Sequence, residues 1–234
     1  MQDSKPNQGN PKSPTLAELK FTTPAYQAEA LRLLIEEANV VAKELGLPEQ
    51  LPITQSSLIE IIIPPPRVGA AIGLGNISTS NYTYYIHPGQ KFALLTKAHL
   101  IATYESLEAN RPVGRIPTNV FQIATQMLAA VEMDVSALNR DCDVNTEAYV
   151  SKLGPGINRT RCLVTWQRRG PVPNGNPAPF LKNAARIEFL LETRELLLLR
   201  VFDRRYNLRR PVEIKNLQLL LERTNDPSGP VVPR

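Results

Sequence analysis

The window at residues 185–203, ARIEFLLETRELLLLRVFD, concentrates more large aliphatic side chains than any other part of the chain. Two apolar runs flank the polar ETRE at 192–195, a spacing typical of a β-hairpin with a short loop. One continuous helix is the alternative, because several leucines also recur near helical spacing and ETRE contains no Gly, Pro or Asn. We favour the hairpin, since Phe189, Leu196 and Leu199 fall off the helical stripe, whereas a sheet covered on both faces accommodates continuous apolar runs.

A long amphipathic helix is predicted over residues 24–45. Thr23 and Pro24 supply an N-cap and a proline at the first helical position, and apolar residues then recur on one face. Gly46 suits the left-handed conformation that ends many helices, and Pro48 prevents continuation.

Short strands are predicted after this helix. Residues 58–63 form an apolar run that ends in three prolines at 64–66, which cannot donate ladder hydrogen bonds and so belong at a sheet edge or in a bend. Residues 81–86 and 91–96 flank a turn and predict a hairpin. A weaker helix is predicted over 98–110.

The second half repeats this order. A helix is predicted over 117–138, and strands follow at 148–153, 161–167, 186–191 and 196–202. The fold class is therefore α+β, with two pseudo-repeated units, each an N-terminal helix packed on an antiparallel sheet. The Pro, Gly and Asn-rich residues 170–183 account for the extra length of the second unit, and we expect the units to superpose once they are omitted.

Four segments follow from this layout. They are a disordered tail at 1–22, a first α+β unit at 23–110, a second α+β unit at 111–223 and a frayed C-terminus at 224–234.

In this layout, residues 24–222 resemble tandem helix-plus-sheet units of the cystatin-like or PepSY-like kind. The resemblance implies a small binding or inhibitory module that often lies outside the cytoplasm. The chain has no cystatin-type inhibitory loop motif, so the resemblance assigns no functional residue.

The composition also bears on location. No apolar run approaches the roughly 18–20 residues of a membrane-spanning helix, so we expect no membrane span. The polar N-terminus MQDSKPNQGNPKSP lacks the apolar segment of a signal peptide, but it is also what remains when such a peptide is trimmed and replaced by a start Met. A periplasmic or secreted location is therefore favoured over a cytoplasmic one, which stays open.

Cys142 and Cys162 are too few for a disulfide scaffold and too widely spaced for a CxxC motif. We expect two buried free thiols. In an exported chain the alternative is one disulfide, closing a loop of about 20 residues and contributing about 3 kcal/mol.

Residues that could carry catalysis are sparse. His87 and His99 are the only histidines and have no G-x-S-x-G elbow to accompany them. Residues 141–147, DCDVNTE, begin with the spacing of a calcium loop but lack its glycine and its closing glutamate, so we expect a polar connection there. We therefore predict no metal site and no cofactor. An enzyme would have to use dispersed carboxylates such as Glu60, Asp141 and Asp143.

Positive charge gathers in the second half. Residues 1–110 carry 8 Lys and Arg against 10 Asp and Glu, whereas the remainder carries 19 against 12. Guanidinium and aromatic groups together suit phosphate, nucleic acid or anionic polysaccharide. The candidate anion-binding residues are Arg161, Arg168, Arg200, Arg204, Arg205, Arg209, Arg210, Trp166 and Tyr206. The alternative is that these arginines solvate strand ends and pair with nearby carboxylates.

The sequence thus favours a non-enzymatic interaction protein with a basic surface on the second unit. Its partner is an unidentified protein or an anionic polymer, and its oligomeric state stays open. A hydrolase-type enzyme with dispersed carboxylates and a polyanion or nucleic-acid binding protein are the alternatives.

Overall fold

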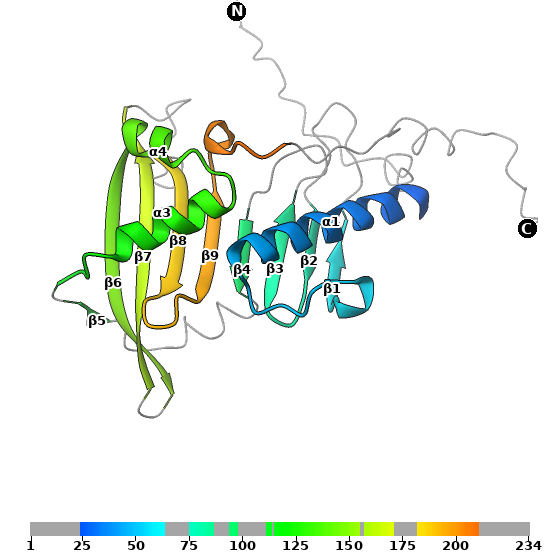
Figure 1. Ribbon diagram of the computed structural model, residues 1–234, viewed down its shortest axis with the longest axis horizontal. Helices are drawn as coiled ribbons and strands as arrows, with labels where there is room; N and C mark the ends of the chain where they lie inside the picture. The colour runs from blue at the N-terminus through cyan, green and yellow to red at the C-terminus, as the bar shows by residue number, and fades with distance from the viewer. Residues whose placement is uncertain are drawn as a thin grey trace, which may run out of the picture.

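The computed structural model describes residues 24–63, 75–86, 94–97, 111–113, 115–154, 157–170 and 182–210. Its nine described strands form one antiparallel sheet, and its long helices lie on one face of that sheet (Figure 1). The fold is α+β, as predicted. The elements are α1 (Pro24–Leu45), η2 (Gln55–Ser57), β1 (Glu60–Ile62), β2 (Gly75–Ser78), β3 (Tyr82–Ile86), β4 (Leu94–Lys97), β5 (Arg111–Pro112), α3 (Val120–Ala130), α4 (Val135–Asp141), β6 (Cys142–Gly154), β7 (Ile157–Arg168), β8 (Asn183–Leu190), β9 (Leu196–Val201) and η5 (Arg204–Tyr206).

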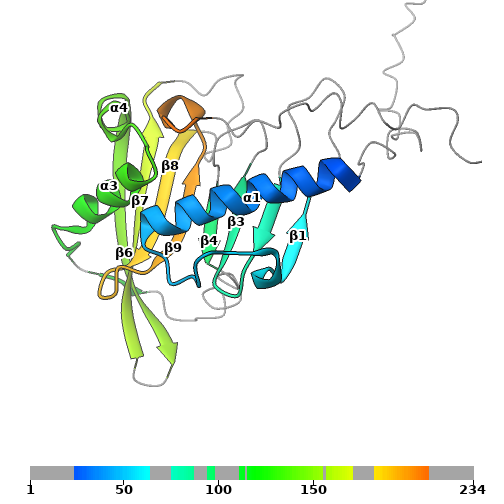
Figure 2. The ribbon, with the colours of Figure 1, turned by 45° about the vertical axis from the view of Figure 1, so that its right-hand side comes forward.

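The order of the strands is β1-β2-β3-β4-β9-β8-β7-β6-β5. Each half of the chain contributes an antiparallel meander, and the two meanders meet where β4 pairs with β9. In Figure 2, α1 crosses the β1–β4 half and α3 crosses the β6–β9 half on the same face. One sheet therefore runs through both predicted units.

The connections between strands differ in length between the halves. Only residues 79–81 join β2 to β3, whereas residues 169–182 join β7 to β8, where the sequence predicts an insertion. That the two halves superpose as copies of one unit stays a prediction.

Helix α1 has the predicted bounds. Gly46 adopts a φ of 59°, the left-handed conformation expected after the last turn. The buried stripe of the helix includes Leu34, which packs closely over β2. A β-carbon added to Gly75 would lie 2.9 Å from Leu34 Cδ1, so the missing side chain lets helix and strand approach.

The predicted hairpin is confirmed by β8 and β9, which pair Ala185 with Val201 and Ile187 with Leu199. The helical alternative for this window is therefore wrong. Arg194 adopts a φ of 54°, so the left-handed residue of this turn is an arginine. The sequence ETRE contains no Gly or Asn that would have predicted such a turn.

The core of the second half centres on Trp166, which is fully buried on β7. Its indole Nε1 donates a hydrogen bond of 2.8 Å to Asn139 Oδ1 on α4, and its ring lies 6.1 Å from that of Phe121 on α3. Trp166 therefore marks the helix-bearing face of the sheet. Side chains one residue along the same strand point to the opposite face, which we call the far face.

Helix is confirmed in most of the range predicted over 117–138, but one continuous helix is wrong, because the chain breaks it into α3 and α4. Glu132 has a φ of 57°, and Met133 leaves the helix to form a β-bridge with Asn207. Asp134 then caps α4 by accepting the Ala137 N–H at 2.9 Å. A contact with a segment remote in sequence ends the first helix here.

The predicted polar connection at 141–147 is also wrong from Cys142 onward, since these residues begin the long strand β6. Cys142 is the register partner of Arg168, whereas Cys162 is the partner of Ala148. The two cysteines therefore lie six positions apart along the β6–β7 ladder, about 20 Å at the usual strand rise. Both are free and buried, so the disulfide alternative is wrong.

Several predicted segments lie outside the described residues. They are the tail at 1–22, the weaker helix at 98–110, most of the loop at 170–183, both histidines, the prolines at 64–66 and the C-terminal segment from 211 onward.

Candidate functional site

The first candidate surface is the outer edge of the sheet at β1. The residues around this strand, Ile59 to Ile63 in sequence IEIII, include three exposed large apolar side chains. Ile59 is 65% exposed, Ile61 41% and Ile62 47%. We call residues 59–63 the β1 edge. Scattered exposed apolar residues are ordinary, but a cluster on an outermost strand is typical of an interaction site.

A groove of about 490 Å³ opens beside the β1 edge. It lies between the N-terminal half of α1, η2 and β1, and none of the described residues that line it is charged. These lining residues are Pro24, Gln27, Ala28, Leu31, Gln55, Ile61 and Ile63. Asn39 fixes the segment leading to η2, because its side chain bonds the Ile53 amide at 2.7 Å and the Ile53 carbonyl at 2.9 Å. The groove is thus held by a hydrogen-bonded frame and suits uncharged side chains.

The backbone of the β1 edge is oriented for pairing. Thr79, the residue directly after β2, donates its amide to the Tyr82 carbonyl of β3 at 2.9 Å. Hydrogen bonding alternates along a strand, so the preceding residue, Ser78, faces β1, where its register partner is Glu60. Ile61, one residue further on, therefore directs its N–H and C=O toward the open edge.

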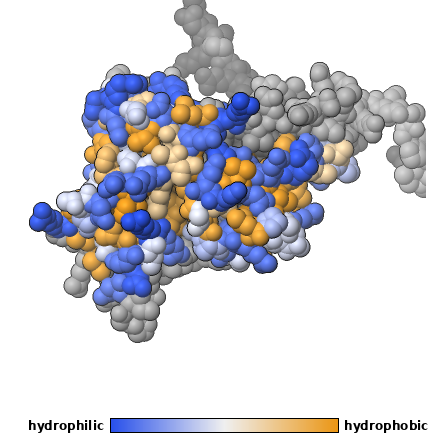
Figure 3. All heavy atoms as spheres, in the orientation of Figure 1, coloured by the Kyte–Doolittle hydropathy of each residue, from blue (hydrophilic) through white to orange (hydrophobic). Residues whose placement is uncertain are grey.

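The two edges of the described sheet differ. At the other end lies β5, which consists of Arg111 and Pro112 alone. Proline has no amide hydrogen, and short strands and prolines are standard protection of a sheet edge. The β1 edge lacks such protection within β1 itself, where the only charged residue is Glu60. Away from the edges, on the helix-bearing face, hydrophobic and hydrophilic side chains are interspersed over both halves (Figure 3).

The second candidate surface is the predicted arginine set. Four of its arginines form ion pairs within the protein: Arg161 with Glu188, Arg168 and Arg205 with Asp203 (3.4 and 2.7 Å), and Arg209 with Glu37 (2.8 Å) and Glu44. Trp166 and Tyr206 are buried. The structure therefore does not bring the nine residues together on one exposed surface.

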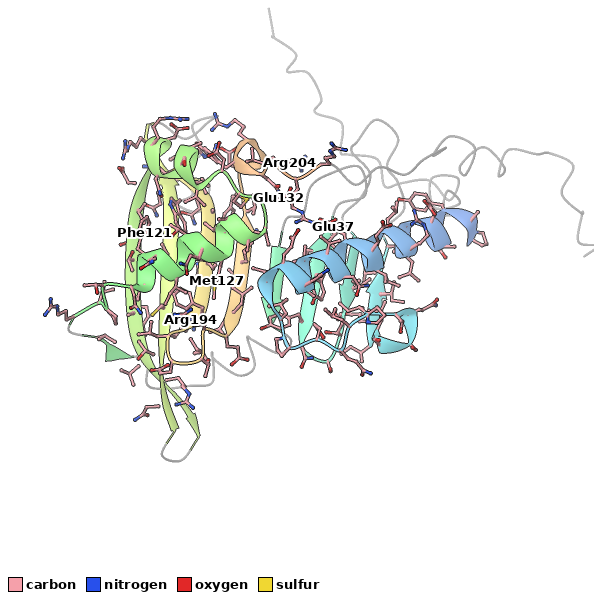
Figure 4. All side chains as sticks on the ribbon, viewed as in Figure 1. Glu37, Phe121, Met127, Glu132, Arg194 and Arg204 are labelled. Atoms are coloured by element: carbon pink, nitrogen blue, oxygen red, sulfur yellow. The ribbon has the colours of Figure 1, made fainter. Side chains whose placement is uncertain are left out.

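Arg205 is exposed despite its ion pair, and three further arginines of the set are exposed as well: Arg200, Arg204 and Arg210. None of these three forms an ion pair with another residue of the described ranges. Arg200 lies on the far face, where its guanidinium stands 4.5 Å from the ring centroid of Phe202. Arg204 projects from η5 at one end of the sheet (Figure 4).

A buried carboxylate organises the far face of the second half. Glu188 is 1% exposed, and it accepts hydrogen bonds from Arg161 Nε at 2.9 Å and from Arg186 Nε at 2.8 Å. Arg186 is also the cross-strand partner of Arg200. Like charges opposed across a ladder are unfavourable, so Glu188 stabilises this arginine cluster.

A buried arginine also ties the two halves together, in a cluster that we call the arginine junction. Arg209, from the segment after η5, reaches Glu37 and Glu44 of α1 with a side chain only 7% exposed. Burial raises the pKa of Glu37 above its ordinary value, Arg209 opposes this rise, and the nearby carboxylates of Glu44 and Glu132 add to it. Figure 4 shows Glu37 on α1 and Glu132 just after α3, in the region between the two halves.

The carboxylates proposed for an enzyme do not converge. Glu60 is on β1 at one edge of the sheet, whereas Asp141 and Asp143 lie at the α4–β6 end of the other half. The hydrogen bond from Arg140 lowers the pKa of Asp141, contrary to the raised value expected of a general acid. Within the described ranges, no three His, Cys, Asp or Glu side chains lie close enough together to hold a metal ion.

The two thiols are poor nucleophiles in this setting. Burial raises the pKa of Cys162 to about 11 and also raises the pKa of Cys142. Reactive cysteines need a lowered pKa and partial exposure. Both side chains therefore serve the core.

The sequence predicted a strand at 58–63 and an edge or bend at the prolines 64–66, but it did not predict residues 59–63 as a candidate site. The signal was the run IEIII directly before three prolines.

In the described part of the chain, no helix combines the length and the apolar character needed to cross a bilayer. In comparisons with known proteins, no family model, no curated protein and no solved structure matches this chain.

Proposed function

We propose that this chain is a non-enzymatic interaction protein that accepts another polypeptide as an added strand at the β1 edge. The observation that carries the proposal is the exposure of Ile59, Ile61 and Ile62 on or next to the outermost described strand, beside a groove whose described lining residues are uncharged. In strand addition, main-chain hydrogen bonds give affinity and pockets for alternate side chains give specificity.

The β1 edge supports both contributions. The outward N–H and C=O of Ile61 offer a backbone hydrogen-bonding site. Burying the remaining exposed area of each isoleucine contributes on the order of 1 kcal/mol. The groove contains the side chains of Ile61 and Ile63 together with Leu31 of α1, so it would receive an apolar side chain from the added strand.

A labelled peptide of alternating valine and threonine, flanked by lysines for solubility, tests the proposal. We expect it to bind the full chain with micromolar affinity in fluorescence anisotropy, because it can form both the backbone and the apolar contacts. Changing Ile59→Lys and Ile61→Lys together should reduce the affinity at least tenfold, since lysine places charge beside an uncharged groove.

Two controls accompany this experiment. Leu208→Lys alters an apolar side chain of similar exposure, 62%, on the other half of the protein and should leave binding unchanged. A peptide N-methylated at alternate amides should bind weakly, because it cannot complete the ladder. Equal binding by the edge variant and the Leu208 variant would contradict strand addition at β1, as would no binding to the chain under conditions in which it is monomeric.

A second candidate function, polyanion binding, is favoured by one observation. Arg200, Arg204 and Arg210 are exposed and form no ion pair within the described ranges. We expect weak retention of heparin and single-stranded DNA at low salt that falls steeply with added salt, because nucleic-acid phosphate contacts release counterions. Arg204→Glu should weaken binding several-fold, whereas Lys43→Glu, an exposed charge reversal on α1, should not. Retention that does not change with salt or with Arg204→Glu would contradict polyanion binding and would mean that these arginines only interact with solvent.

A further inference from the structure

We infer that the strand added at the β1 edge is the β1 edge of a second copy of this chain, related by a two-fold axis that passes beside Ile61. The inference rests on the proposed function, because it names the partner of the same site. Three features of the described residues support it: register, backbone orientation and the protection of the opposite edge.

The register is self-complementary. In an antiparallel pair centred on Ile61, each Ile61 opposes its symmetry mate and Glu60 opposes Ile62 of the other copy. The only charged residue of β1 therefore faces an apolar one, and no like charges are opposed. A centre on Glu60 would instead bring two carboxylates face to face, so the charge of the edge disfavours that register.

The backbone agrees with this centre. Ile61 directs its N–H and C=O away from β2, and a two-fold axis beside it would make the two Ile61 residues a hydrogen-bonded pair that exchanges both bonds. Residues opposed across a ladder project to the same face. The Ile61 side chains would thus meet on the helix-bearing face, where each also lines the groove of its own copy.

The pairing also ends further growth of the sheet. The described sheet of each copy has one apolar edge at β1 and one proline-containing edge at β5. A β1-to-β1 contact uses both apolar edges, and the described edges that remain are the two at β5, which resist pairing. Such an isologous contact closes on itself, so a dimer is expected rather than a fibre.

Cysteine crosslinking of the full chain tests the register directly. With the two-fold axis beside residue 61, the Cα atoms of the two Ile61 residues lie about 5.5 Å apart, inside the range that a disulfide spans. Under mild oxidation Ile61→Cys should therefore form a covalent dimer in high yield. The native thiols should stay out of this reaction, because both are buried with raised pKa values.

Ile62→Cys is the matched control, since its side chain is exposed to a similar extent, 47% against 41%. In the proposed register the two residues at 62 are offset along the strands and lie about 8 Å apart, beyond the reach of a disulfide. Crosslinking at 62 that equals crosslinking at 61 would overturn the inference.

Sedimentation velocity of the unmodified chain supplies the second measurement. We expect a concentration-dependent shift from monomer to dimer with no larger species, and Ile61→Lys should keep the chain monomeric with an unchanged circular dichroism spectrum. A chain that stays monomeric up to near-millimolar concentration, and whose Ile61→Cys variant gives no crosslinked dimer, overturns the inference. If the valine–threonine peptide still binds that monomer at the β1 edge, strand addition stands and only the second copy is rejected; if neither peptide nor second copy binds, both fail.

Discussion

Replacing Arg209 with methionine is expected to lower the free energy of unfolding by about 3–5 kcal/mol, the usual cost of removing one partner from a buried ion pair. Arg209 is the cation of the arginine junction, where it bonds Glu37 at 2.8 Å and also bonds Glu44. Its loss leaves these carboxylates and Glu132 close together without compensation. Urea denaturation followed by circular dichroism measures the effect, which is large against the about 5–15 kcal/mol that stabilises a typical domain.

The neighbouring residue provides a matched control. Arg210→Met removes an exposed guanidinium with no ion pair in the described ranges and should change stability by less than about 0.5 kcal/mol. Adding Glu37→Gln and Glu44→Gln to Arg209→Met should restore much of the loss, because the like charges disappear with the arginine. A loss that the added substitutions do not reduce would mean that Arg209 acts through packing rather than charge.

Trp166→Ala is expected to have a comparable effect, a loss of about 3–5 kcal/mol, because it empties the largest fully buried side-chain volume of the described core. The indole holds α3 through Phe121 and α4 through Asn139, so the cavity also loosens both helices from β7. Chemical denaturation should show the loss, and near-ultraviolet circular dichroism should lose its single tryptophan signal.

Trp166→Phe separates packing from hydrogen bonding. It retains most of the ring volume and loses the bond to Asn139, whose side chain is exposed and regains a water partner. We expect Trp166→Phe to lower the free energy of unfolding by about 1 kcal/mol for the lost hydrogen bond, in addition to the cost of the smaller ring. The total should be well below the loss in Trp166→Ala. If alanine and phenylalanine cost the same, the contribution of Trp166 lies in its hydrogen bond.

The sequence was most informative where local signals agreed. Pro24, Gly46 and the apolar stripe between them predicted α1 to the residue. The hairpin of β8 and β9 was also predicted correctly, because its two apolar runs are continuous and similar in length. In both elements, neighbours along the chain decide the structure, so no distant contact was needed.

Two predictions of secondary structure were wrong for different reasons, one after α3 and one at the start of β6. The break after α3 arises from the bridge between Met133 and Asn207, residues far apart in sequence that no local pattern connects. The start of β6 did carry a signal, since Asp143, Asn145 and Glu147 alternate with apolar or smaller residues at strand spacing. The same residues also match the spacing of a calcium loop, which favoured a polar connection over a strand.

The candidate sites could be predicted only in part. Arg209 was recognised as one of a cluster, but its partners on α1 lie in the other half of the chain and are apparent only in the folded protein. The β1 edge needed the strand order, because the same isoleucines in a central strand would be ordinary core. Residue types were thus readable from the sequence, whereas burial and neighbours were not.

The contact between β4 and β9 also matters for biosynthesis. Leu94 on β4 pairs with Arg200 on β9. The ribosome adds Arg200 roughly 100 residues after Leu94, a delay of about 5–20 s at ordinary rates of elongation. Throughout that interval β4 of the nascent first half can pair with β3 on one side, but β9, its partner on the other side, has not yet been synthesised. Cells that produce this protein therefore face a window in which neighbouring nascent chains on one messenger could exchange strands, and slower translation of the second half would widen it.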